Sequence, residues 1–76
     1  MKFIIYGSGC SKCQQLTTNT EEAAKALNID YEIEKETDMN NIIAAGIMRT
    51  PALSINDEIA VEGKVANVEE IKKLLI

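Results

Sequence analysis

The only two cysteines of this 76-residue chain, Cys10 and Cys13, lie three positions apart, between an apolar run and a stretch of helical periodicity. The apolar run at 3–5 predicts a strand over residues 2–6, and the periodic stretch predicts a helix over residues 11–27. Because positions i and i+3 are neighbours on a helix surface, the two thiols can close a disulfide with little backbone movement. The pair therefore constrains the chain to a strand, a sharp turn and a helix, in that order.

The residues around the pair predict which thiol attacks a substrate and which resolves the intermediate. Gly7 and Gly9 precede Cys10 and let the chain turn out of the strand, because glycine accepts backbone angles closed to other residues. Unpaired N–H groups and the positive end of the helix dipole favour a thiolate there, and such placement lowers a cysteine pKa from about 8.5 to roughly 3.5 to 7.5. We predict that Cys10 is the nucleophile and Cys13 the resolving thiol. Lys12 adds a positive charge that stabilises the thiolate or is simply solvated.

Charge and hydropathy exclude several classes of function. The net charge of −4, with no large basic patch, argues against nucleic acid or an anionic membrane as a partner. No apolar run approaches the roughly 18 residues of a membrane span, and the residues before Gly7 are far too few for a signal peptide. We expect a single domain over residues 1–76, monomeric and cytoplasmic.

In a reducing cytoplasm, a cysteine pair is more often catalytic or metal-binding than structural. A disulfide that closes so short a loop adds only roughly 2 kcal/mol to the free energy of unfolding in the chain-entropy model. The protein should therefore stay folded when this disulfide is reduced, as a reversible redox pair requires.

The segment 29–34 alternates apolar and polar residues, which predicts a strand with one face in water. Its acidic outer face is typical of an edge strand. The acid-rich run 30–38 is therefore interpreted as a solvated edge rather than a metal site. The first strand, the helix and this second strand predict a right-handed βαβ unit with parallel strands.

A short helix over residues 39–46 follows, with Asp38 (or Thr37) as its N-cap and a glycine at its end. Met39 and Met48 are expected to fill the core rather than to act as ligands.

The last third of the chain predicts a hairpin and a helix. Residues 52–55 and 58–61 form two strands around the two-residue turn 56–57. Asn67, with Glu70 three residues later, predicts a capping-box-like helix start. The buried stripe of this helix is expected to consist of Val68, Ile71, Leu74 and Leu75.

Pro51, the only proline, opens the third predicted strand, where a missing N–H is tolerated. With C-x-x-C after the first strand and Thr-Pro before the third, the chain resembles the thioredoxin superfamily, in particular the short glutaredoxin-like mini-thioredoxins of archaea and bacteria. The most specific segments are residues 6–13, 49–52 and 62–66. The resemblance implies an α/β, thioredoxin-like fold, βαβαββα, with a four-stranded mixed sheet in the order 2-1-3-4 and three helices.

The resemblance also implies roles for individual residues. Cys10 carries over as the attacking cysteine and Cys13 as the resolving one. Pro51 carries over as the cis-proline beside the disulfide, with the Thr50 backbone pairing with an extended substrate chain. A cis X–Pro bond is far less unfavourable than a cis bond before any other residue. Lys12 and Gly63 complete the expected substrate-binding residues.

Two features depart from the family pattern. The residues between the cysteines are Ser11-Lys12, neither the Gly-Pro typical of thioredoxins nor the Pro-Tyr typical of glutaredoxins, so a redox potential does not carry over. The glycine pair with which glutaredoxins bind glutathione is reduced to Gly63-Lys64, so glutathione use is not implied.

The leading hypothesis is a thiol–disulfide oxidoreductase or electron carrier that needs no bound cofactor and no metal. Its partners would be disulfide-containing proteins or small disulfides, together with a reducing partner, either a thioredoxin reductase-like enzyme or a small thiol. The alternative is a soft-metal module, such as a copper chaperone, whose two thiolates bind Cu(I). A structural zinc site would need four ligands, and the chain has no further Cys and no His. A redox-inert interaction domain is the third reading.

Overall fold

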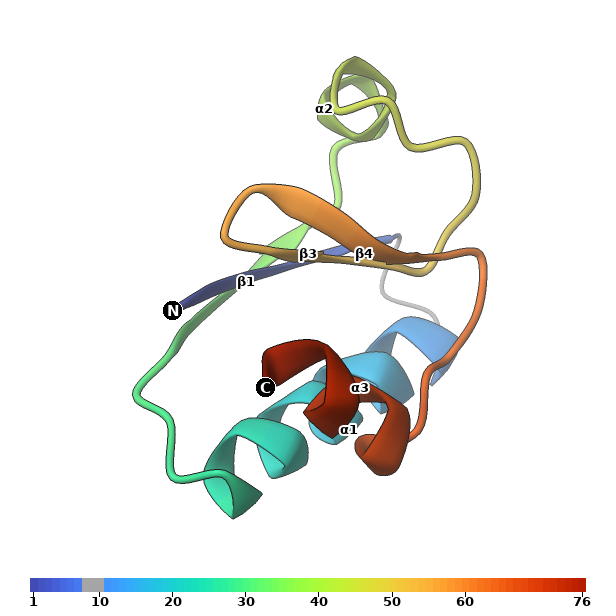
Figure 1. The fold of residues 1–76 in the computed structure, drawn as a ribbon. Helices are drawn as coiled ribbons and strands as arrows, with labels where there is room; N and C mark the ends of the chain where they lie inside the picture. The colour runs from blue at the N-terminus through green and yellow to red at the C-terminus, as the bar shows by residue number, and fades with distance from the viewer. Residues whose placement is uncertain (8–10) are drawn as a thin grey trace.

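A computed structural model describes residues 1–7 and 11–76 of the chain. Four strands and three helices follow one another in the predicted order βαβαββα (Figure 1). The elements are β1 (Lys2–Tyr6), α1 (Ser11–Ala26), β2 (Glu32–Glu36), α2 (Met39–Ala44), β3 (Ala52–Ile55), β4 (Glu58–Glu62) and α3 (Val68–Leu75).

The strands form one mixed sheet in the order β2-β1-β3-β4, which confirms the predicted fold class. β1 pairs with β2 in parallel, with Phe3 opposite Ile33, and with β3 antiparallel, with Tyr6 opposite Ala52. The acidic strand β2 lies at an edge, as expected. This order brings the end of β1, the start of β3 and the end of β4 to the same end of the sheet.

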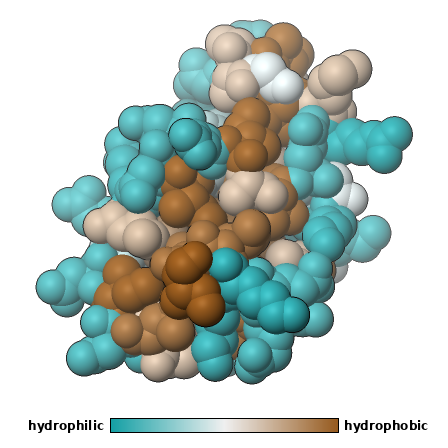
Figure 2. Space-filling view, in the orientation of Figure 1, coloured by the Kyte–Doolittle hydropathy of each residue, from teal (hydrophilic) through white to brown (hydrophobic). Residues whose placement is uncertain are grey.

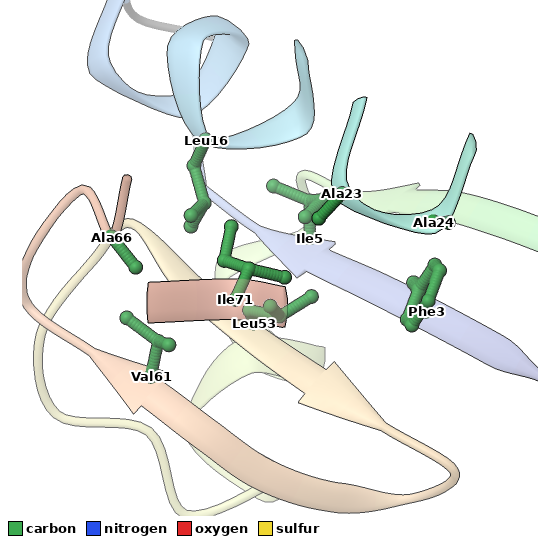
Figure 3. Packing of buried hydrophobic residues seen from close by; sticks show 9 residues of the cluster. All are labelled: Phe3, Ile5, Leu16, Ala23, Ala24, Leu53, Val61, Ala66 and Ile71. Carbon is green, nitrogen blue, oxygen red and sulfur yellow. The ribbon is translucent and has the colours of Figure 1, made fainter. Parts of the chain in front are cut away.

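The helices form two unequal layers. α1 and α3 pack together below the sheet in Figure 1, and α2 lies above it. The main core fills the space between the sheet and the α1–α3 pair (Figure 3). Its fully buried members include Phe3 on β1, Leu16 on α1, Leu53 on β3 and Ile71 on α3. These apolar side chains come from both layers, so burying them holds the helices to the sheet.

The opposite face of the sheet is covered only in part. Ile42, Ile47 and Ala52 form a small second cluster with Tyr6 beneath α2. An unbroken apolar run such as residues 3–5 is typical of a strand covered on both faces, but Ile4 is only half-buried. The reason is that α2 spans only six residues and reaches only part of this face.

Local signals in the sequence set several element ends. Asp38 caps α2 by accepting a hydrogen bond from the Asn40 amide (2.8 Å). Asn67 and Glu70 form the predicted capping box of α3. Asn56 and Asp57 both have positive φ, as the tight turn between β3 and β4 requires.

β2 begins later than the alternation predicts, at Glu32 rather than at residue 29. The Ile29 amide donates to the Ala24 carbonyl (3.0 Å), and Asn28, which adopts a positive φ, donates to the Lys25 carbonyl (3.1 Å). These bonds are the Schellman pattern of a helix C-terminus. Ile29 is therefore held by the cap that follows α1 and does not join the sheet.

Three apolar residues expected inside are exposed. Met39 and Met48 do not fill the core, and Met48 is 91% exposed. Leu74 on α3 is 47% exposed, whereas Ile71 on the same helix is fully buried. Figure 2 shows hydrophobic surface at the top of the view, where Figure 1 places α2. Within the described residues, no helix is long and apolar enough to span a bilayer.

Candidate functional site

Gly7 and Cys13 lie against each other at this end of the sheet. Cys13 lies in the first turn of α1 and is only 4% exposed. A Cβ placed on Gly7 would overlap the Cys13 sulfur. The Gly7 amide donates to the Glu36 carbonyl (3.0 Å), which extends the pairing of β1 with β2 by one residue. The sheet thus fixes Gly7 in place, and the missing side chain leaves the space that the sulfur occupies.

The reason for a glycine at position 7 differs from the one we expected. Among the described glycines, positive φ values occur at Gly46 and Gly63, not at Gly7. Gly7 is therefore needed for the close approach of Cys13 rather than for a special backbone angle. Gly9 and Cys10, named in the same prediction, lie outside the described residues.

A small cavity of about 70 Å³ borders Cys13. It is lined by Ile5, Gly7, Cys13, Gln14, Thr17, Lys35 and Thr37. Its volume exceeds the roughly 10 to 15 Å³ that one water molecule needs. Thr17 turns its hydroxyl inward to the Cys13 carbonyl (2.9 Å), and Lys35 is the charged residue of this lining. The buried thiol therefore has room for water beside it.

Thr50 and Pro51 also lie at this end of the sheet, near Gly7 and Cys13. The Thr50–Pro51 peptide bond is cis, and Pro51 is buried. A Cβ on Gly7 would lie 3.9 Å from the Thr50 Cβ. The same glycine therefore borders both Cys13 and Thr50, which brings the start of α1 next to the segment before β3.

Residues at the end of β4 form hydrogen bonds with the segment before β3. The Gly63 amide donates to the Pro51 carbonyl (2.9 Å). Gly63 has φ +73°, and a Cβ there would lie 3.0 Å from the Arg49 side chain. The Glu62 carboxylate accepts hydrogen bonds from the amides of Met48 (2.7 Å) and Arg49 (3.3 Å).

The structure thus gathers most of the expected site residues. Cys13, Thr50, Pro51 and Gly63 meet at one end of the sheet. Lys12 is exposed in the first turn of α1 and makes no ion pair within the part of the chain described. Cys10, the expected nucleophile, lies outside the described residues. Among the residues described, no three His, Cys, Asp or Glu side chains gather as metal ligands.

Two features escaped the sequence analysis. Lys35 lies beside the cavity because it pairs in register with the core residue Ile5. That register could have been estimated by aligning the two predicted parallel strands. Glu62 gave no signal, because an exposed glutamate at a strand end is ordinary, and its partners at Met48 and Arg49 are distant in sequence.

A sheet in the order β2-β1-β3-β4 with helices on both faces, and a cysteine in the first turn after β1, defines the thioredoxin-like class. Comparison with known proteins agrees. A family model described as thioredoxin domain matches residues 1–76. A thioredoxin of Methanothermobacter thermautotrophicus is 48% identical over 75 residues, covering 99% of this chain and 97% of its own. A thioredoxin of Methanocaldococcus jannaschii is 46% identical over 71 residues, covering 93% of this chain and 81% of its own.

The chain belongs to the thioredoxin-domain family. Membership confirms the predicted resemblance and the enzyme class, thiol–disulfide oxidoreductase.

Proposed function

We propose that the chain reduces disulfides through a reversible Cys10–Cys13 disulfide, with Cys10 attacking and Cys13 resolving. The observation that carries this proposal is the position of Cys13. Its sulfur is buried against Gly7, and the same glycine borders Thr50. A shielded thiol suits a resolving cysteine, because it does not compete with an outer thiol for the substrate.

The reaction is a pair of thiol–disulfide exchanges. The Cys10 thiolate attacks one sulfur of the substrate disulfide, the S–S bond breaks, and the first substrate thiolate leaves. The Cys13 thiolate then attacks the Cys10 sulfur of the mixed disulfide and displaces the second. Two electrons pass from the dithiol to the substrate, whose two sulfurs leave as thiols once protonated. In the second step, the cavity beside Cys13 gives its proton a route to water.

The segment before Pro51 is proposed to hold the substrate. The Thr50 amide and carbonyl make no hydrogen bond to any residue that the structure describes. An extended peptide can pair with such a main-chain edge as with a neighbouring strand. In this proposal Pro51 borders the reacting sulfurs, Gly63 supports it through the Pro51 carbonyl, and Lys12 favours the Cys10 thiolate.

The partners follow from the chemistry. The substrates are proteins with accessible disulfides or small disulfides. A reductase or a small thiol must return two electrons to the Cys10–Cys13 disulfide after each turnover. No bound cofactor takes part, because the sulfurs themselves carry the electrons. We place the reaction in the cytoplasm, whose thiol pool keeps such a pair reduced.

Two serine variants test the mechanism. Cys10→Ser should abolish reduction of a disulfide substrate, because it removes the nucleophile. Cys13→Ser should accumulate a mixed disulfide with the substrate, detectable by non-reducing gel and mass spectrometry. Parent activity in both variants would refute the mechanism.

A redox titration separates this function from the soft-metal alternative. Metal-free protein equilibrated with a thiol–disulfide buffer should show one two-electron transition between roughly −300 and −120 mV, the range of known dithiol carriers. Protein that purifies with stoichiometric metal and resists oxidation would instead support metal binding.

A further inference from the structure

Glu62 ends β4 and reaches across to the segment before Pro51. One of its carboxylate oxygens, Oε2, accepts hydrogen bonds from two successive amides, those of Met48 (2.7 Å) and Arg49 (3.3 Å). In Figure 1 the segment that returns from α2 descends to the sheet at the end where β4 finishes. A single side chain therefore joins β4 to residues 13 and 14 positions earlier in the chain.

The direction of the Glu62 side chain follows from strand alternation. Val61 is buried in the main core, so its neighbour Glu62 points to the other face of the sheet. α2 and the segment that follows it lie on that face. The register shift between Leu53 and Ser54 sets which β4 residues face inward near this end. The alternation and register of β4 therefore direct the Glu62 side chain toward the segment that follows α2.

Three contacts from β4 and its exit hold the backbone around Thr50. Besides the two amides bound by Glu62, the Pro51 carbonyl accepts from the Gly63 amide (2.9 Å). The Arg49 side chain lies against Gly63. Thr50 sits between these anchors, and its own main-chain groups are unbonded within the described structure.

We propose that Glu62 is a positioning residue that holds the 48–51 segment in the shape needed to receive an extended substrate chain. This inference rests on the proposed function, because it assigns a task within substrate binding. Glu62 does not touch the reacting sulfurs in this scheme. It acts through Met48 and Arg49, whose amides it fixes ahead of the bend that presents Thr50.

The exposure of Glu62 determines which property should change. Because Glu62 is exposed, water can replace its oxygen on both amides when the side chain is removed, so the fold should hardly lose stability. The released segment would then have to be ordered on each binding event, and such ordering weakens association. The loss should appear in KM for a substrate that pairs with the backbone, not in kcat.

Steady-state kinetics with two substrates test the proposal. One is a peptide with an extended segment on each side of its disulfide, and the other is a small disulfide without a peptide chain, such as hydroxyethyl disulfide. We expect Glu62→Ala to raise KM for the peptide about tenfold, the effect of ordering roughly one residue of backbone on binding, with kcat unchanged. Glu62→Gln keeps an acceptor oxygen and should restore KM to within about threefold of the parent. The small disulfide should be reduced equally by all variants.

Glu58→Ala is the matched control. Glu58 lies at the other end of β4, is exposed, and makes no ion pair among the described residues. This substitution removes the same charge from the same strand and should leave KM for the peptide unchanged. An equal rise in KM in Glu58→Ala would mean that net charge, not positioning, is responsible, and would overturn the proposal.

Amide hydrogen exchange gives a readout independent of activity. Exchange at Met48 and Arg49 should be faster in Glu62→Ala than in the parent and unchanged in Glu58→Ala. If the parent reduces the peptide through its two cysteines but Glu62→Ala shows the same KM and the same exchange, the proposed role of Glu62 is overturned and the proposed function stands. A parent that reduces neither substrate would overturn the proposed function, and this inference with it.

Discussion

The sulfur of Cys13 lies where a side chain on Gly7 would begin. Gly7 is fixed by its hydrogen bond to β2, and Cys13 by the first turn of α1, so neither can withdraw from the other freely. This contact links the sheet to the start of the helix at the point where thiol chemistry is proposed. It also borders Thr50, so a disturbance at Gly7 reaches both the thiol and the substrate segment.

We expect Gly7→Ala to destabilise the protein by about 1 to 3 kcal/mol, the usual effect of forcing a methyl group into a packed site. Urea denaturation measures the loss. In a Cys13→Ala background, the sulfur is absent and the same substitution should be much less harmful, which a double-mutant cycle detects as coupling. Equal losses in both backgrounds would mean that Gly7 is needed for some reason other than the sulfur.

The burial of Cys13 predicts unequal thiol reactivity. In the reduced Cys10→Ser variant, Cys13 is the only thiol, and its 4% exposure should make alkylation by iodoacetamide slow. The same variant in denaturant should react at the rate of an ordinary exposed cysteine. Mass spectrometry over time follows both reactions. Rapid alkylation of the folded variant would contradict a shielded resolving thiol.

Substitution by alanine should destabilise the protein far more at Ile71 than at Leu74, although both residues are large and apolar and lie on α3. Ile71 is fully buried in the main core, so Ile71→Ala should destabilise the protein by about 2 to 5 kcal/mol. Leu74 is 47% exposed, and Leu74→Ala should cost less than about 1 kcal/mol. Thermal or urea unfolding of the two variants provides the test. Similar losses would show that Leu74 is buried in solution.

Glu70 should give the protein a small acid-sensitive contribution to stability. The hydrogen bond from the Lys64 side chain, with the backbone bond at Asn67, holds the pKa of Glu70 below its ordinary value. A carboxyl whose pKa is lowered by folding stabilises the protein above its ordinary pKa, and the contribution disappears as the pH falls through the lowered value.

Glu70→Gln keeps the shape of the capping box and removes the charge. Its melting temperature should therefore fall less than that of the parent between about pH 7 and about pH 3, where other carboxyls titrate equally in both. Glu58→Gln, at an exposed glutamate with no ion pair among the described residues, removes the same charge elsewhere and serves as control. Parallel curves for Glu70→Gln and the parent would remove Glu70 from the acid response.

The sequence alone was enough for the features that depend on near neighbours. The period of the apolar residues predicted α1, and the Asn56-Asp57 turn predicted the β3–β4 hairpin. The caps at Asp38 and Asn67 appeared where expected. Such signals are readable because a cap or a turn is completed within a few residues of chain.

Only the tertiary structure decided which distant residues meet. The contact of Gly7 with Cys13 depends on the angle at which α1 leaves the sheet, and the hydrogen bonds of Glu62 depend on the register of β4. The exposure of Met48 and Leu74 likewise follows from how much of each surface another element covers. Apolar character says that a side chain gains from burial, but the packing of the whole chain determines whether a partner is there to bury it.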